Sequence, residues 1–133
     1  MNNTKPRIMV VDDSQSMRAA AKSALGDEFE VVVCENGLEA IAAMAAFKPE
    51  LVFVDITMPK LDGYETVALI RLNEAFANVP VLMMSSKGGV FDLARGRLLG
   101  FNGSIVKPFQ AKDLRRAVDE HLELGTGAEA TEK

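Results

Sequence analysis

The sequence predicts an α/β fold, a doubly wound parallel sheet of five strands with helices on both faces. Two observations lead to this prediction. Five short apolar runs alternate with five segments of helical periodicity along the 133 residues. Three of the runs are solidly apolar, as expected for parallel strands that are covered on both sides. The connections are short, and right-handed crossovers leave few other topologies.

The apolar runs define the predicted strands in chain order. The first, third and fourth contain only apolar residues, whereas the last is the shortest and gives the weakest signal. The predicted strands are Ile8–Val11, Phe29–Val33, Leu51–Val54, Val81–Met84 and Ser104–Val106.

The segments between the runs carry apolar stripes at spacings of three and four residues, which predict amphipathic helices. Ser14 can cap the first helix, the third begins after Gly63, the fourth at about Phe91 and the fifth at about Gln110. Lys87-Gly88-Gly89, which leads into the fourth, is expected to be mobile. The predicted buried stripes are Met17, Ala20, Ala21, Ala24 and Leu25; Leu38, Ile41, Ala42 and Ala45; Tyr64, Val67, Ala68 and Ile70; Phe91, Ala94, Leu98 and Leu99; and Leu114, Val118 and Leu122.

Composition and charge limit the class of protein. Hydrophobic residues make up 48% of the chain and charged residues 26%, as in ordinary globular domains and unlike disordered chains. The net charge of −4 disfavours nucleic-acid binding. Cys34 has no second cysteine to pair with, and the single histidine, His121, excludes the usual Cys/His zinc sites.

Hydropathy and the chain ends bear on location. No run approaches the ~18 consecutive apolar residues of a membrane span. The opening MNNTKPR lacks the long apolar stretch of a signal peptide. We therefore expect a cytoplasmic protein of one domain, with no membrane insertion and with short flexible termini at 1–6 and 125–133.

Polar residues follow four of the five predicted strands. Ligands of an open parallel sheet bind in the crevice at the carboxyl ends of its strands. Cys34 and Glu35 follow the second run, which as an edge strand would hold them away from the crevice. The side chains expected to meet there are Asp12 and Asp13, Asp55, Ser85 and Ser86, and Lys107 with Pro108.

Each of these residues also has a purely structural explanation. Asp12 and Asp13 precede a helix, where aspartate is a common cap. Asp55 leads into a turn-rich loop, and Ser85 could cap the next helix. A lysine at a strand end, such as Lys107, is usually solvated. These explanations leave the placement of all five residues at one edge unexplained.

The chemistry of such a group indicates a divalent cation and a phosphoryl group. Two like charges ~4 Å apart repel by about 4 kcal/mol at an effective dielectric constant of about 20. Mg²⁺ relieves this repulsion, and it commonly combines one or two carboxylates with a phosphate oxygen. A lysine and a serine hydroxyl can hold further phosphoryl oxygens, and a carboxylate can accept a phosphoryl group. The sequence therefore predicts an aspartate that becomes phosphorylated beside Mg²⁺.

Four motifs resemble the receiver domains of bacterial response regulators, in particular the stand-alone chemotaxis type. They are VVDDSQSMR, FVDITMPKLDGYE, VPVLMMSSK and SIVKPF, and the likeness extends over residues 7–124. It implies a flavodoxin-like (βα)5 fold with strand order 2-1-3-4-5. DGYETVALIRLNEAF and SSKGGVFDLARGRLLGF further resemble the receivers of type IV pilus twitching-motility systems.

The resemblance implies how the aspartates act. Asp55 would be the phosphoacceptor, and a phosphohistidine on a chemotaxis-like sensor kinase would be the donor. Asp13 and Asp55 would bind Mg²⁺ directly, Asp12 would assist through water, and the Thr57 carbonyl would complete the protein ligands. The chain would act as a signalling domain, with no enzymatic activity beyond its own phosphorylation and slow autodephosphorylation.

The resemblance also implies a switch. Ser85 would be the hydroxyl that moves to the phosphoryl group, Lys107 would pair with that group, and the Lys107-Pro108 bond would be cis. Three residues before the lysine the family usually carries an aromatic residue that moves with the hydroxyl, and here Ser104 takes that place. The usual output face, formed by the fourth helix, fifth strand and fifth helix, carries Arg95, Arg97, Lys112, Arg115 and Arg116, which are otherwise explained as solvated surface.

The same residues bear on three alternative functions. A docking module whose output is independent of phosphorylation stays an alternative, because the aromatic half of the switch is missing. A phosphatase of the haloacid-dehalogenase type would carry a second aspartate two residues after the first, where this chain has Thr57. A flavodoxin-like electron carrier would place its flavin phosphate after the first strand, where Asp12 and Asp13 would repel it.

Overall fold

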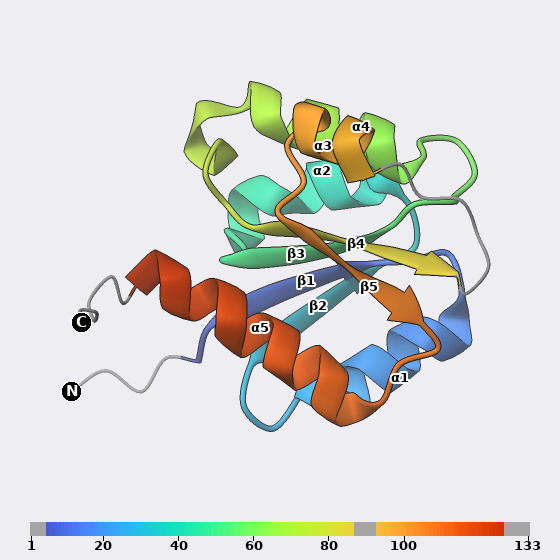
Figure 1. Ribbon diagram of the computed structural model, residues 1–133, viewed down its shortest axis with the longest axis vertical. Helices are drawn as coiled ribbons and strands as arrows, with labels where there is room; N and C mark the ends of the chain where they lie inside the picture. Colours follow the sequence, from blue (N-terminus) through green and yellow to red (C-terminus); the bar gives the residue numbers. More distant parts are fainter. Residues whose placement is uncertain (1–4, 87–92, 127–133) are drawn as a thin grey trace.

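The computed structural model describes residues 5–86 and 93–126. Strands and helices alternate along the chain as predicted (Figure 1). Residues 1–4 and 127–133 of the predicted flexible termini lie outside the described ranges, as do Lys87-Gly88-Gly89 and Phe91. The elements are β1 (Arg7–Val11), α1 (Gln15–Leu25), β2 (Glu30–Cys34), α2 (Gly37–Phe47), β3 (Leu51–Asp55), α3 (Gly63–Leu72), the short 3-10 helix η1 (Glu74–Phe76), β4 (Val81–Ser86), α4 (Leu93–Leu99), β5 (Gly103–Lys107) and α5 (Ala111–Thr126).

The five strands form one parallel sheet in the order β2-β1-β3-β4-β5. Both the fold and the strand order are as predicted. The order of strands reverses between β1 and β3, which is the point where open sheets of this type bind ligands. Val11 pairs with Val54 there, so the residues that follow these two strands are neighbours.

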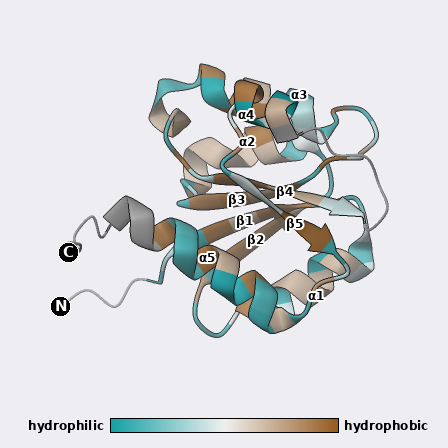
Figure 2. Ribbon diagram, in the orientation of Figure 1, coloured by the Kyte–Doolittle hydropathy of each residue, from teal (hydrophilic) through white to brown (hydrophobic). Residues whose placement is uncertain are grey.

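Helices cover both faces of the sheet. α1 and α5 lie against one face, and α2, α3 and α4 lie against the other (Figure 1). Because side chains alternate along a strand, Val10 and Phe53 pack towards α1 and α5, whereas Val11 and Val54 pack towards the other layer. Figure 2 shows the apolar residues concentrated in the strands. No helix in the described ranges is long and apolar enough to cross a bilayer.

Local polar signals fix where two of the helices begin. The Ser14 hydroxyl accepts a hydrogen bond from the Met17 amide and caps α1, as predicted. Asp62 and Glu65 form a capping box at the start of α3, in which each side chain accepts from the other's amide. Both caps satisfy amides that have no acceptor within the helix.

The predicted buried stripe of α2 was wrong by about one residue. Leu38 is 55% exposed and Ala42 and Ala45 are exposed, whereas Ile41 is half-buried. The sequence GLEAIAAMAAF is apolar almost all round, so periodicity could not select the side that faces the sheet. The residues that are buried are Gly37, Ala40 and Met44.

The predicted stripes of α4 and α1 also need correction. In α4, Ala94 is exposed and Leu98 is 87% exposed, whereas Leu99 packs against the core. α4 has only seven residues, too few for the pattern to define one side. In α1, Ala20 is exposed although Ala21 and Leu25 are buried.

Several boundaries differ by one or two residues from those predicted, among them the ends of β3 at Asp55 and of β4 at Ser86. β2 begins at Glu30, with Phe29 buried just before it. α5 continues to Thr126, two residues beyond the end expected for the domain. Extending an existing helix adds one hydrogen bond per residue, so a weakly apolar end can still be helical.

Arg71 ties the end of α3 to two neighbouring segments. Its guanidinium donates to the Gly100 carbonyl at 2.7 Å from Nη2, to the Phe76 carbonyl at 2.9 Å and to Asn102 Oδ1 at 2.9 Å. Gly100 has a φ of 109°, and a Cβ there would lie 2.8 Å from the Arg71 Nε. The glycine therefore provides both the backbone conformation and the space that this contact requires.

Replacing Arg71 should destabilise the fold. We expect Arg71→Met to lower the free energy of unfolding by about 2–4 kcal/mol, because several carbonyl and amide oxygens lose a charged donor. Urea unfolding measures the change. Arg97→Met, on the exposed side of α4, is the control and should change stability by less than about 0.5 kcal/mol. Equal effects of the two substitutions would show that the Arg71 contacts contribute nothing specific.

Candidate functional site

Three carboxylates meet at the carboxyl ends of β1 and β3. Asp12 and Asp13 follow β1, Asp55 ends β3, and each offers an oxygen within 4.8 Å of the others. Asp12 is fully buried and Asp55 is 5% exposed, whereas Asp13 is exposed. The predicted juxtaposition is confirmed, and these three carboxylates could together hold a metal ion.

Main-chain groups and one arginine side chain hold Asp12 in place. Its amide donates to the Cys34 carbonyl, its Oδ1 accepts from the Ser14 amide at 2.9 Å, and its carbonyl accepts from the Arg18 guanidinium at 2.8 Å. Ser14, not either aspartate, is the cap of α1. The structural explanation of these aspartates as helix caps is therefore wrong. Sequence reasoning missed Arg18, because its partner here is a main-chain carbonyl that no pattern of side chains reveals.

Lys107 reaches the acidic group from the end of β5. Its ammonium lies 3.1 Å from Asp12 Oδ2 and 3.3 Å from Asp55 Oδ2. The Lys107-Pro108 peptide bond is cis, as the resemblance implied. The lysine is thus partly buried between two carboxylates, so the alternative of a solvated strand end is wrong.

Burial and neighbouring charges shift the pKa values of Asp55 and Lys107. Burial and the neighbouring Asp12 charge raise the pKa of Asp55 from 3.8 to about 6, although Lys107 acts in the opposite direction. Burial alone would lower the pKa of Lys107, but the hydrogen bonds and charges of Asp12 and Asp55 raise it. At neutral pH, Asp55 is therefore mostly ionised, although the site makes its ionisation less favourable than it is in water.

The loop between β3 and α3 passes directly over the end of β3. The Thr57 amide donates to Asp55 Oδ1 at 3.3 Å, and Thr57 itself is exposed. The Gly63 amide donates to the Ile56 carbonyl at 2.9 Å. A Cβ on Gly63 would lie 2.6 Å from the Asp55 carbonyl oxygen, so only glycine allows this close approach.

Ser85 lies inside β4, so it does not cap the following helix. β4 pairs Met84 with Asp55, and alternation then places Ser85 on the opposite face of the sheet, with Met83 and the layer of α3 and α4. Ser85 is 8% exposed, and no described residue hydrogen-bonds to its hydroxyl. A buried hydroxyl without a partner is uncommon and is available for a ligand. Ser86, the next residue, is exposed.

Cys34 and Glu35 lie at the end of the edge strand β2, as predicted. Cys34 is buried, and burial raises the pKa of its thiol to about 11. The Glu35 amide donates to Glu39 Oε1 at 2.6 Å. Neither side chain belongs to the acidic group at the ends of β1 and β3.

The face of α4, β5 and α5 lacks the aromatic residue expected of the family. Ser104 is exposed, and Val106 beside it is 52% exposed. Arg95 does not project freely from α4, because its guanidinium lies 4.2 Å from the centroid of the Tyr64 ring on α3. Lys112 and Arg116 of α5 are exposed.

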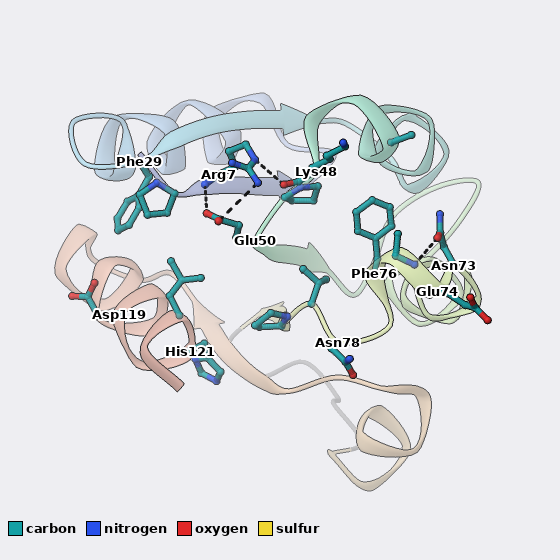
Figure 3. Close-up of a pocket in the computed structure, with 17 residues that line it drawn as sticks. Arg7, Phe29, Lys48, Glu50, Asn73, Glu74, Phe76, Asn78, Asp119 and His121 are labelled. Atoms are coloured by element: carbon teal, nitrogen blue, oxygen red, sulfur yellow. Dashed lines mark hydrogen bonds and ion pairs between the residues drawn. The ribbon is translucent and has the colours of Figure 1, made fainter. Parts of the chain in front are cut away.

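A hollow that was not predicted lies at the amino ends of the strands, opposite the acidic group (Figure 3). It has a volume of about 1290 Å³, and residues of both charges line it, among them Arg7, Lys48, Glu50 and Asp119. The Arg7 guanidinium already donates to the Lys48 carbonyl, and the Arg7 amide donates to Glu50. His121 also lines the hollow, and its Nδ1 lies 2.9 Å from the Ala117 carbonyl oxygen. No group of three metal-ligating side chains occurs in this hollow among the described residues.

The fold and the group at the strand ends define a receiver domain. A model of the response regulator receiver domain family matches residues 8–119, and the chain belongs to this family.

Individual relatives agree with this assignment. The chain is 42% identical to Protein PilG of Pseudomonas aeruginosa over 125 residues, which cover 93% of each chain. It is 38% identical to Chemotaxis protein CheY of Listeria monocytogenes over 86% of this chain and 96% of that protein. The solved structure of Vibrio cholerae chemotaxis protein CheY4 has a TM-score of 0.84 at 27% identity and covers 88% of this chain and 98% of its own. The predicted likeness to chemotaxis and pilus receivers is confirmed.

The raised pKa of Asp55 predicts a stability effect with a definite sign. The folded protein keeps this proton up to about pH 6 and the unfolded chain only up to about pH 3.8, so wild-type stability falls as the pH rises between these values. In EDTA at pH 7.5, Asp55→Asn should therefore raise the free energy of unfolding by about 1–3 kcal/mol. The gain should vanish below about pH 4, where both states are protonated.

Urea unfolding between pH 4 and pH 8 checks this expectation. Asp27→Asn, at an exposed position after α1, is the control and should change stability little at any pH. If Asp55→Asn is less stable than the wild type throughout, the attraction to Lys107 outweighs burial and repulsion.

Proposed function

We propose that the protein is a phosphorylation-switched response regulator in which Asp55 accepts the phosphoryl group. The observation that carries the proposal is the Lys107 ammonium within 3.3 Å of both Asp12 and Asp55 at the carboxyl end of the sheet. An acceptor carboxylate must be ionised, fixed and close to positive charge. Asp55 meets all three conditions, whereas Asp13 is exposed and forms no ion pair with Lys107.

The transfer needs little from the protein beyond position and charge. A carboxylate oxygen of Asp55 forms a bond to phosphorus as the bond from phosphorus to the donor's histidine nitrogen breaks, and the nitrogen retains the electron pair. The Thr57 amide orients one oxygen of Asp55, and Lys107 neutralises part of the added charge. No side chain has to act as an acid or a base on Asp55, which is mostly ionised at neutral pH.

The acidic group suits Mg²⁺. Three carboxylates within 4.8 Å are a hard oxygen donor set, and their mutual repulsion is relieved by a divalent cation. Asp13 and Asp55 would bind the ion directly, Asp12 through water, and Thr57 through its carbonyl. When bound, the ion would neutralise charge on the phosphoryl oxygens.

Ser85 and Lys107 are the candidates to sense the phosphoryl group. The Ser85 hydroxyl is buried and has no hydrogen-bond partner within residues 5–86 and 93–126, so a phosphoryl oxygen beyond the end of β4 would give it one. Movement of Ser85 would act on the layer of α3 and α4, since its side chain lies on that face. Phosphorylation would in this way change the surface that a partner meets.

The donor would be a sensor histidine kinase of a chemotaxis-like system. The similarity to PilG favours a pathway that controls pili, and the similarity to CheY favours chemotaxis-like signalling. Phosphotransfer from such a kinase would take place in the cytoplasm. The output would be phosphorylation-dependent binding of a protein target at the face of α4, β5 and α5.

A second candidate function is a docking module whose output does not depend on phosphorylation. The exposed Ser104 favours it, because no aromatic side chain is there to carry movement of Ser85 to the output face. Such a module would not need the full set of groups at the strand ends, so the first function is favoured by the presence together of Asp12, Asp13, Asp55, Ser85 and Lys107.

Phosphorylation of the purified protein tests the first function. With acetyl phosphate or phosphoramidate and Mg²⁺, the intact mass should increase by one labile phosphoryl group, because Asp55 is ionised and lies beside Lys107. Asp55→Asn should abolish the gain, and Ser86→Ala, at an exposed neighbour of Ser85, should not. Undiminished labelling of Asp55→Asn would place the acceptor elsewhere.

Replacing Lys107 should separate phosphorylation from switching. Arginine keeps the charge but replaces a compact ammonium by a wide planar fork, so Lys107→Arg should still be labelled while the response of β4 and α4 is lost. Amide exchange at Ser85 and over α4, with and without beryllofluoride, measures the response, and Lys112→Arg is the exposed control. If the wild type itself shows no change, the docking module without a switch is the better description.

A further inference from the structure

β2 is an edge strand whose outer side has no neighbour in the described part of the chain. It pairs with β1 alone, from Arg7–Glu30 to Val11–Cys34. The Glu30 amide donates to the Pro6 carbonyl and the Cys34 carbonyl accepts from the Asp12 amide, so both residues point their main chain towards β1. The N–H and C=O of one strand residue point to the same side, and the side alternates along the strand. Val31 and Val33 therefore point their N–H and C=O groups outwards.

Several sequence features that usually prevent an edge strand from pairing with another chain are missing from β2. The sequence EVVVC contains no lysine, proline or glycine, and Val31, Val32 and Val33 are each half-buried. At the carboxyl end, the outward Glu35 amide is satisfied by Glu39 Oε1. The available edge thus consists of two N–H and two C=O groups at Val31 and Val33, beside apolar side chains.

The exposed charges on β2 and on the segments directly before and after it are acidic, and the nearest lysines in the sequence are Lys22 and Lys48. Residues 23–47 contain no lysine or arginine. They contain five exposed acidic side chains, Asp27, Glu28, Glu30, Glu35 and Glu39. Antiparallel pairing of two β2 strands would bring these carboxylates together, so a second copy of the chain is disfavoured. An extended segment with basic residues would be attracted.

We propose that the β2 edge is a docking site for an extended, basic segment of a partner protein, which adds to the sheet beside Val31–Val33. Main-chain hydrogen bonds to Val31 and Val33 would supply the pairing, as in other cases of strand addition. Lysine or arginine side chains that flank the added strand would meet Glu28, Glu30 and Glu35. This site lies at the opposite edge of the sheet from β5, so it can be occupied without covering the face of α4, β5 and α5.

The test uses a synthetic peptide, acetyl-Lys-Val-Lys-Val-Lys-Val-Arg-amide, and NMR of the full chain. The amides of Val31 and Val33 should exchange rapidly in the free protein and become protected when the peptide is added. The Val32 amide, which faces β1, should be protected in both cases. The same peptide with glutamate in place of its basic residues should leave exchange unchanged.

Two variants separate the main-chain contribution from the charge. Val33→Pro removes an outward N–H without removing a donor to β1, and it should weaken peptide binding at least tenfold. Glu30→Gln should weaken binding about two- to fivefold, the size expected for one exposed ion pair, whereas the matched Glu74→Gln on η1 should not. Should Val33→Pro fail to fold, amide exchange at Val31 and Val33 in the wild type still decides whether the peptide pairs with β2.

Three results would overturn the proposal. One is peptide binding that leaves the Val31 and Val33 amides unprotected. Another is equal binding of the acidic peptide. The third is protection of these amides at high protein concentration without peptide, together with a dimer in sedimentation, because the occupant would then be a second copy of this chain.

Discussion

The contact of Lys107 with Asp12 and Asp55 is the interaction on which the site depends. Asp12 is fully buried and Asp55 nearly so, and two like charges that close together repel strongly unless a cation lies nearby. Lys107 supplies that charge from β5, at the far edge of the sheet from β2. The site therefore forms only when β1, β3 and β5 occupy their places in the sheet, so its chemistry depends on the sheet as a whole.

The sheet also distributes the site over two layers of helices. Asp55 and Lys107 project on the side of α1 and α5, and Ser85 projects on the side of α3 and α4, because side chains alternate along each strand. The loop after Asp55 must then cross the end of β3 closely, and Gly63 allows this. A few backbone constraints thus bring carboxylates, an ammonium and a hydroxyl to one edge from distant parts of the chain.

Much of this arrangement could be predicted from the sequence, for identifiable reasons. Solid apolar runs define buried strands, and parallel strands bring their carboxyl ends together, so Asp12, Asp13, Asp55, Ser85 and Lys107 could be placed at one edge. The side of α2 that faces the sheet could not, because an almost wholly apolar helix has no polar side to exclude. Arg18 and Arg71 were missed because they donate mainly to main-chain carbonyls, which leave no mark in the sequence.

The Arg95 guanidinium, stacked on the Tyr64 ring, links α4 to α3 and so bears on how α4 can move. α4 has only seven residues, and Leu98 on its outer side contributes nothing to the core. A helix this short has little apolar area to fix its orientation, so the stacking of Arg95 on Tyr64 at 4.2 Å adds to what holds it against α3. A rotation of α4 would change which of its residues face solvent and would also have to alter this contact, while the strands beneath it stay in place.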